Sequence, residues 1–506
     1  MQRDPPIDDE INTRLESYFG QVTVDLFEQL YLTGALRNDG SSTFSRQYRR
    51  SWFPKGSAAW TFTNYLPSQP VLSFGKLRAA YGEAGQEPNA YLTSATYDGS
   101  TLISGIVQGT GFSPVYSGLG GLYTSNLRAA DDLKPERSKE TELGFDLGLF
   151  QDRADMGFTY YNAVTDDVIL NLPIAPSSGF TVEAQNAAKF RNAGIELTLN
   201  VRPITRPNMQ WSVGLQYAHN RSKVNGLRGA EFVNLDPLGL DPYNSIIPGQ
   251  PVGTFRGGGF VRCGISDEAG LGIAEACAGQ PRGALYIDED GFPLEDAQPR
   301  VLGDPNPKWT GGVNSSFTYR GITLSGLLDI RVGGKIYNGT RGALLSYGTH
   351  RDTENRATCV PATAPATGLA CTGNEQVFGQ GGWFDGPVAG PGAGEAVPIG
   401  ENWYRLGLGN CLFTSTVNEA CVEDGGFVKL REIALAYSLT GGFVERTLGM
   451  SSVDLRVAGR NLATWSDYTG YDPETNLGGA VQNTRGYDYF NQPQTRSFLV
   501  SFTLNR

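Results

Sequence analysis

Apolar and polar residues alternate with a period of two in segment after segment of this 506-residue chain. Period two is the side-chain repeat of a β-strand, whose successive residues point to opposite faces. The clearest run sets Leu143, Phe145, Leu147 and Leu149 against Glu142, Gly144, Asp146 and Gly148. Comparable runs cover residues 18–26, 28–37, 57–65, 74–82, 156–161, 195–202, 211–218, 313–320, 322–331, 427–437, 453–462 and 496–504. The pattern predicts an all-β chain of about 14 strands.

The lengths of the connections favour a transmembrane antiparallel β-barrel over a soluble β-sandwich. Short turns are expected near 150–153, 203–207, 320–321 and 439–450, and they alternate with long polar connections near 83–133, 220–250, 264–305, 336–424 and 465–492. Short turns at one end and long extracellular loops at the other are typical of outer-membrane barrels. The charged residues along the polar faces fit a water-filled interior. Plugged barrels have about 22 strands, so residues 1–506 are predicted to be the C-terminal part of such a barrel.

Composition agrees with this prediction and excludes other classes. No apolar run approaches the roughly 18 residues of a membrane-spanning helix, but a barrel hides its apolar residues by alternation. The net charge of −11 argues against nucleic acid as a partner, because phosphate binding needs a basic surface. The first residues lack a charged segment followed by an apolar one. We therefore expect an export signal upstream of this sequence.

Six cysteines fall into three close pairs within predicted loops, namely Cys263 and Cys277, Cys359 and Cys371, and Cys411 and Cys421. None has zinc-site spacing, and the chain has only two histidines. Three local disulfides in an oxidising compartment are favoured. Unpaired loop thiols are the alternative.

Two kinds of loop residue are candidates for binding. The first kind is acidic: Asp288, Asp290 and Glu295 lie in a segment with a central glycine and offer oxygen ligands for Ca²⁺. The ligand spacing of a calcium-binding loop is incomplete, however, and a solvated turn is the simpler interpretation. Aromatic side chains could instead stack on sugar rings or contact a lid protein, or they could pack the cores of the loops. These aromatic candidates are Trp383, Phe384, Trp403, Tyr404, Tyr487 and Tyr489.

The sequence contains no recognisable catalytic set, so we expect no enzymatic activity. Charged residues of the predicted strands are interpreted as ion pairs facing the barrel interior. Asp329 with Arg331 forms one such group, and Asp454 with Arg456 and Arg460 forms another.

Several motifs, in order along the chain, resemble those of TonB-dependent transporters of the SusC/RagA type. They are Leu36-Arg-Asn-Asp-Gly-Ser-Ser-Thr-Phe with Trp52-Phe-Pro, Leu77-Arg-Ala-Ala-Tyr-Gly-Glu-Ala-Gly-Gln, Leu133-Lys-Pro-Glu, Asn192-Ala-Gly-Ile-Glu-Leu, Gly249-Gln-Pro-Val-Gly, Gly303-Asp-Pro-Asn-Pro-Lys-Trp and Tyr468-Thr-Gly-Tyr-Asp-Pro-Glu. Each motif is weak alone, and their order over nearly the whole chain carries the resemblance.

This resemblance implies uptake of a large nutrient, a glycan or a peptide, across the outer membrane of a Gram-negative bacterium. It also implies a SusD-like lipoprotein lid, contact with outer-membrane lipid, and energy from the TonB complex through an upstream plug domain. The plug and the first strands are not in this sequence, and no cofactor is implied. A ferric-siderophore or other TonB-dependent receptor and a non-transport surface adhesin are the alternatives.

Overall fold

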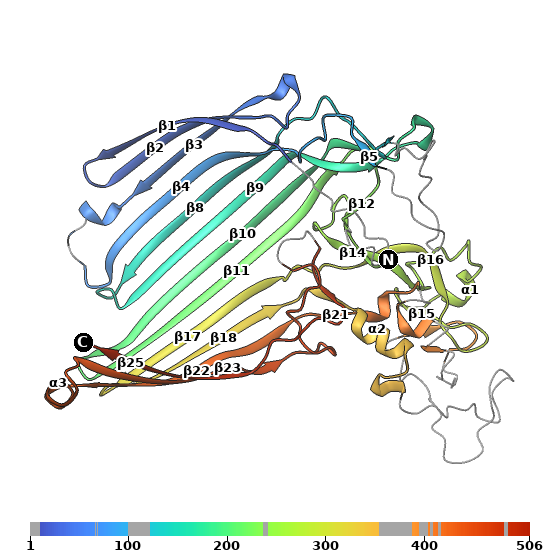
Figure 1. Cartoon of the computed structure of the whole chain (residues 1–506). Helices are drawn as coiled ribbons and strands as arrows, with labels where there is room; N and C mark the ends of the chain where they lie inside the picture. Colours follow the sequence, from blue (N-terminus) through green and yellow to red (C-terminus); the bar gives the residue numbers. More distant parts are fainter. Residues whose placement is uncertain are drawn as a thin grey trace, which may run out of the picture. The chain divides into compact units, whose positions relative to one another are not determined.

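The computed structural model describes residues 11–65, 67, 69–99, 122–235, 241–353, 387–393, 403–404, 408–412, 416–479 and 484–506. Two compact units divide the chain. The first contains residues 1–203, 212–233 and 247–252, and the second contains residues 204–211, 234–246 and 253–506. Strands dominate both units (Figure 1). The described residues contain no helix that is both long and apolar enough to cross a membrane.

The first unit is built on long antiparallel strands that follow one another in chain order, each pairing with the next. The strands are β1 (Leu15–Leu26), β2 (Leu30–Ser41), β3 (Arg50–Trp60), β4 (Leu72–Gln86), β8 (Glu136–Leu149), β9 (Ala154–Pro173), β10 (Val182–Arg206) and β11 (Met209–Leu227). A tight turn joins the predicted runs 18–26 and 28–37, with positive φ at Phe27 and Glu28. Three short strands accompany them, β5 (Tyr97–Gly99), β6 (Leu122–Thr124) and β7 (Leu127–Arg128).

Two strands extend into the stretch between the predicted runs 28–37 and 57–65, which also contains a 3₁₀ helix at Arg46–Tyr48. β2 continues to Ser41 and β3 begins at Arg50, with Asn38 opposite Trp52. Polar side chains are compatible with a strand here because Arg50 donates to Asn38 at 2.9 Å and pairs with Glu16. Backbone pairing with the neighbouring strand, rather than alternation, extends these two elements.

The second unit also contains antiparallel strands in chain order, β17 (Trp309–Tyr319), β18 (Ile322–Val332), β22 (Phe427–Thr440), β23 (Ser452–Trp465) and β25 (Ser497–Asn505). The turn at Arg320–Gly321 is as predicted. The 439–450 connection, expected to be a simple turn, contains the helix α3 (Gly442–Leu448).

The described parts of the long connections of the second unit are folded rather than irregular. These parts contain three small sheets and two α-helices (Figure 1). One sheet comprises β12 (Val233–Asn234), β13 (Tyr243–Ile246), β14 (Thr254–Phe260) and β16 (Glu295–Gly303). Another sheet joins β15 (Leu285–Tyr286) to β20 (Val388–Ala389). The third sheet joins β21 (Val422–Asp424), β19 (Lys335–Asn338) and β24 (Tyr487–Asp488). The helices are α1 (Ala274–Cys277) and α2 (Gly339–Ser346).

Burial confirms that the alternation does not build a soluble sandwich. The apolar side chains of β25 are exposed, with Phe498 at 75% and Phe502 at 64% of full exposure. The same holds for Leu435 and Tyr437 of β22. Contiguous exposed apolar surface is rare on soluble monomers, whereas outer-membrane barrels present such a band to lipid. The all-β barrel-type fold predicted from the sequence is confirmed.

Candidate functional site

A β-bulge in β22 concentrates charge on its polar face. Leu328 pairs with Leu430 while Leu327 pairs with Glu432, so Arg431 is the extra residue. The register with β23 shifts at the same place. A bulge re-aims side chains, and here it lets the consecutive residues Arg431 and Glu432 both form ion pairs with polar-face partners. The doublet Arg431-Glu432, which breaks the alternation, was the sequence signal for this bulge.

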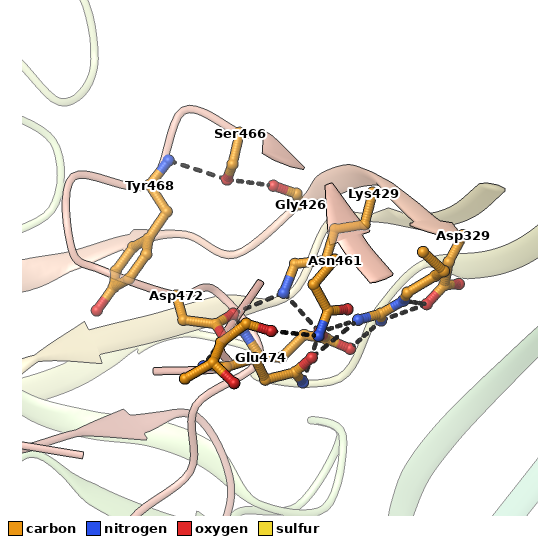
Figure 2. A network of polar contacts seen from close by, with 11 residues as sticks. Asp329, Gly426, Lys429, Asn461, Ser466, Tyr468, Asp472 and Glu474 are labelled. Atoms are coloured by element: carbon orange, nitrogen blue, oxygen red, sulfur yellow. Dashed lines mark hydrogen bonds and ion pairs between the residues drawn. The ribbon is translucent and has the colours of Figure 1, made fainter. Parts of the chain in front are cut away.

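The connection between β23 and β25, residues 466–496, is held against this charged face; we call it the 466–496 loop. The Nζ of Lys429 lies 2.6 Å from Oδ1 of Asp472 and 2.5 Å from Oε2 of Glu474. Lys429 is only 4% exposed. Arg431 reaches the same Glu474 at 2.6 Å and donates from Nε to Asp329 at 3.0 Å (Figure 2). Lys429 and Arg431 thereby tie the loop to β22, and Arg431 also binds β18 through Asp329.

Hydrogen bonds at both ends of the loop complete the attachment. Ser466 donates to the carbonyl of Gly426 at 2.6 Å and accepts from the backbone of Tyr468 at 3.1 Å, and Asn461 donates to the carbonyl of Thr495 at 3.1 Å. Figure 2 shows Ser466, Gly426 and Asn461 around the ion pairs. The β22 strand and the loop therefore form one connected polar network.

The two loop carboxylates are held ionised. Burial disfavours the charge on Asp472, but the Lys429 ammonium and the backbone N–H groups of Glu474 and Gln494 outweigh it, so the pKa of Asp472 lies below its usual value. Burial likewise opposes ionisation of Glu474, and hydrogen bonds from Arg431 and Lys429 reverse that effect and lower its pKa. Both side chains are fixed hydrogen-bond acceptors.

A polar hollow of about 400 Å³ opens beside these carboxylates. Every residue that lines it has a polar side chain: Asp472, Glu474, Thr475, Asn476, Asn491, Gln492 and Gln494. Gln494 also donates to Glu474 at 3.0 Å. We call this cavity the 466–496 hollow. Its volume is in the range of small-molecule sites.

Tyr487 anchors the other side of the loop. It is fully buried, and its hydroxyl donates to the carbonyl of Pro242 and accepts from the backbone of Asn244 at 2.9 Å. Its ring packs edge-to-face against Phe255 at 5.3 Å and Tyr337 at 6.2 Å. Tyr487 thus ties the loop to β13, β14 and β19.

The next residue, Asp488, extends this anchor by accepting from Thr340 at 2.8 Å and from the hydroxyl of Tyr468 at 2.6 Å. Burial and then Asp488 raise the pKa of Tyr468, so that phenol stays protonated and remains a donor.

The aromatic candidates divide between buried positions and residues outside the described part of the chain. Trp403 and Tyr404 are buried with Phe260, Leu285 and other apolar residues, and Trp403 stacks on Phe292 at 5.5 Å. These two and Tyr487 match the loop-core alternative, since a buried ring offers no free face to a ligand. Tyr489 is half-buried against Phe490. Trp383 and Phe384 lie outside the described residues.

Two predicted cysteine pairs are bonded. Cys263 joins Cys277 with a Cα–Cα distance of 5.3 Å, and Cys411 joins Cys421 at 6.0 Å. The prediction of local disulfides is confirmed for these two pairs. Cys359 and Cys371 lie outside the described residues.

The acidic segment 288–296 forms a turn stabilised by its own side chains. Asp288 accepts from the backbone of Asp290 at 3.0 Å and of Phe292 at 2.8 Å, and Glu295 accepts from Thr416. Within the described part of the chain, the only close group of three possible metal ligands is Cys263, Glu268 and Cys277, in which both cysteines are disulfide-bonded. The three candidate carboxylates are therefore not brought together, which favours the solvated turn over a calcium site.

The predicted ion pairs exist with different partners. Asp329 pairs with Arg431, not with Arg331, whose guanidinium donates to the carbonyl of Pro305 at 2.9 Å. The second group is also rearranged, because Arg456 and Arg460 both pair with Glu432 while Asp454 accepts from Ser438 and Asn505. Both corrections follow from the bulge and the strand register, which sequence spacing does not reveal.

Comparison with known proteins gives the family context. The family model for the TonB dependent receptor-like β-barrel matches residues 2–358. TonB-dependent receptor P3 of Formosa agariphila is 28% identical over 97% of this chain and 45% of its own length. TonB-dependent receptor SusC of Bacteroides thetaiotaomicron is 22% identical over 97% of this chain and 43% of its own length.

Among solved structures, that of the RagAB peptide transporter is similar in fold, with a TM-score of 0.68 and 18% identity over 97% of this chain and 48% of that one. The chain thus spans less than half the length of each of these relatives.

Proposed function

The chain belongs to the TonB dependent receptor-like β-barrel family, and on that premise we propose that the protein imports a large nutrient across the outer membrane of a Gram-negative bacterium. The observation that carries the proposal is the family match over residues 2–358. The nutrient is a glycan or a peptide, and import is TonB-dependent. The motif resemblance to the SusC/RagA type, with relatives named SusC and RagAB, supports this choice within the family.

The proposed partners are a SusD-like lipoprotein, which would cap the long loops, and the TonB complex, which would act through a plug domain. Folded loops support the first partner. In the second unit they form small sheets with buried cores around Tyr487 and Trp403, so they offer a preformed surface rather than flexible chain. The proposal assigns no catalytic step to this chain.

Uptake by the intact protein in its native membrane tests the import function. We expect cells that express it to accumulate a labelled oligosaccharide or peptide, and cells lacking it to accumulate neither. Collapse of the proton-motive force with a protonophore should abolish that uptake, because TonB transmits this energy. Uptake that persists after the collapse, or that does not depend on the protein, would contradict the proposal. Affinity purification of the tagged protein should recover a lipoprotein partner in stoichiometric amount.

A further inference from the structure

We propose that the lipid-facing side of β8, β9 and β10 binds an anionic lipid of the outer leaflet at a defined place. Lys139, Lys189 and Arg191 would hold its phosphate, and an apolar hollow nearer the middle of the membrane would take one of its acyl chains. The proposal rests on residence in the outer membrane, which is part of the proposed function, and not on import. It goes beyond the contact with bulk lipid that any membrane barrel makes.

The strand register shows which side chains share this side of the sheet. Leu143 of β8 lies opposite Tyr160 of β9, and Tyr160 lies opposite Ile195 of β10. Leu143 is 52% exposed although it is apolar, as expected of a side chain in contact with lipid. Every second residue of a strand points to the same face. Lys139 and Arg191, each four residues from this row, therefore lie on the lipid-facing side too.

Three cations gather on this face, on the side of the long connections. Lys139 and Lys189 both bind Asp166, at 3.1 Å and 2.8 Å. Arg191 donates from Nε to the neutral amide of Asn162 at 2.6 Å, and it forms no ion pair with any described residue. One carboxylate is thus shared by two lysines, and the arginine has none.

Neighbouring charges do not cancel this excess. Arg137 pairs with Glu83 of β4 at 2.6 Å, so that pair is neutral. Glu140 and Glu142 alternate with Lys139 and Leu143 along β8, so they point to the opposite face. With the neutral pair included, four cations face two carboxylates at this level of the lipid-facing side, an excess of two positive charges.

The cations lie at the height expected for lipid headgroups. A strand rises about 3.3 Å per residue, so Lys139 lies roughly 13 Å beyond Leu143 along β8. Tyr81, which lies opposite Thr141 in the row between them, is typical of a membrane–water interface. Cations at this height attract anionic lipids, and lysine and arginine both bind phosphate through charge-assisted hydrogen bonds.

An apolar hollow of about 410 Å³ opens on the same face, toward the middle of the membrane. One row across four strands consists of large side chains, namely Trp60, Leu77, Phe145 and Phe158. The next row toward the cations begins with two small residues, Ala58 opposite Ala79, and continues with Leu143. The small residues leave space between larger neighbours, which suits a chain of methylene groups.

The two features together select the ligand. A soluble anion would use the cations but not the apolar hollow, and a neutral lipid would use the hollow but not the cations. A lipid with a phosphorylated headgroup uses both, and the two features meet on β8 and β9.

Native mass spectrometry of the intact purified protein in a neutral detergent tests the proposal. The probe is a lipid A that carries two phosphates, and the comparison is the same lipid after enzymatic removal of both phosphates. We expect the phosphorylated lipid to bind saturably. The dephosphorylated lipid should bind at least about tenfold more weakly, because it lacks the charge that the cations attract.

Three substitutions separate the headgroup from the acyl chain. Lys189→Gln and Arg191→Gln should each weaken binding about fivefold, which corresponds to ~1 kcal/mol for a cation near an anionic headgroup. Ala79→Trp fills the apolar hollow and should weaken binding about fourfold, the effect of excluding one methylene group, ~0.8 kcal/mol. The matched control is Arg202→Gln at the other end of β10, where Arg202 pairs with Asp155 at 2.9 Å; this variant should bind as the parent does.

Three results would overturn the proposal: equal binding of the dephosphorylated lipid, binding by the Lys189 and Arg191 variants that matches the control, or displacement of the lipid by equimolar inorganic phosphate. Unchanged binding by Ala79→Trp would remove the acyl chain from the apolar hollow. The thermal unfolding midpoint of each variant should equal that of the parent, which separates lost lipid contacts from a displaced strand. A failed lipid titration leaves the import function standing, and absent uptake with intact lipid binding removes only the import function.

Discussion

Replacing Lys429 by methionine should release the 466–496 loop from β22. The ammonium of Lys429 is buried between Asp472 and Glu474, and the methionine keeps the shape of the stem while removing the charge. Breaking a buried ion pair by removing one partner costs about 3–5 kcal/mol, mainly because the other charge is left unpaired. Arg431 still compensates Glu474, and backbone N–H groups still bond to Asp472. We therefore expect the lower end, ~3 kcal/mol.

The assay is hydrogen exchange of residues 466–479 in the intact protein. A loss of ~3 kcal/mol in the free energy of local opening corresponds to a roughly 150-fold faster exchange. The control is Arg460→Gln, because the side chain of Arg460 is 53% exposed and Glu432 keeps Arg456 as a partner. An exposed pair contributes at most about 1 kcal/mol, so this variant should accelerate exchange about fivefold or less.

A second substitution separates charge from packing. Adding Asp472→Asn to Lys429→Met removes the uncompensated carboxylate, so the double variant should recover at least half of the lost protection. If Lys429→Met exchanges no faster than Arg460→Gln, the ion pairs do not hold the loop. If the double variant is no better than the single one, lost packing rather than unpaired charge explains the effect.

Three further outcomes are expected. The pKa values of Asp472 and Glu474 in the folded protein lie below their ordinary values of 3.8 and 4.5, so their stabilisation of the loop is complete above those ordinary values. Protection of the loop from hydrogen exchange should therefore hold from pH 7 to about pH 5 and fall as the pH drops through the lowered values. Unchanged protection at pH 3 would contradict this role of the two carboxylates. Replacing Cys263 and Cys277 by serine opens a crosslink with a sequence separation of 14, and should lower the local stability of that loop by ~3 kcal/mol, measured by hydrogen exchange. Calorimetric titration of Ca²⁺ should show no saturable site in segment 288–296, since its carboxylates are not grouped; a 1:1 site lost on substitution there would reverse this expectation.

Short-range features of this molecule were readable from sequence. The alternation at residues 142–149 predicted the strand β8 correctly. Successive side chains of a strand point to opposite faces, so this pattern does not depend on which strands pair with it. The pairing of Cys263 with Cys277 and of Cys411 with Cys421 was readable because a close spacing in a polar loop leaves few other partners.

Other features depended on long-range registration between strands and loops. The stretch Phe427–Tyr437 is predicted as one strand, and the doublet Arg431-Glu432 interrupts its alternation. Only the pairing with β18 shows that a bulge at Arg431 shifts the phase and gives Asp329 a partner 102 residues away. From the sequence, Tyr487 fitted a ligand contact and a residue of the loop core equally well. Only its hydrogen bond to Asn244, 243 residues earlier, shows it to be a buried anchor.

The alternation of the strands and the ion pairs of Lys429 and Arg431 thus have different origins. Sequence by itself determined the β-strands, their apolar faces and the local disulfides, because each depends on residues close together in the chain. Tertiary structure decided the partners of Lys429 and Arg431 and the polar hollow beside them. Those partners lie on separate strands and loops, and the free energy of each contact depends on how the intervening chain is folded and on how far water is excluded.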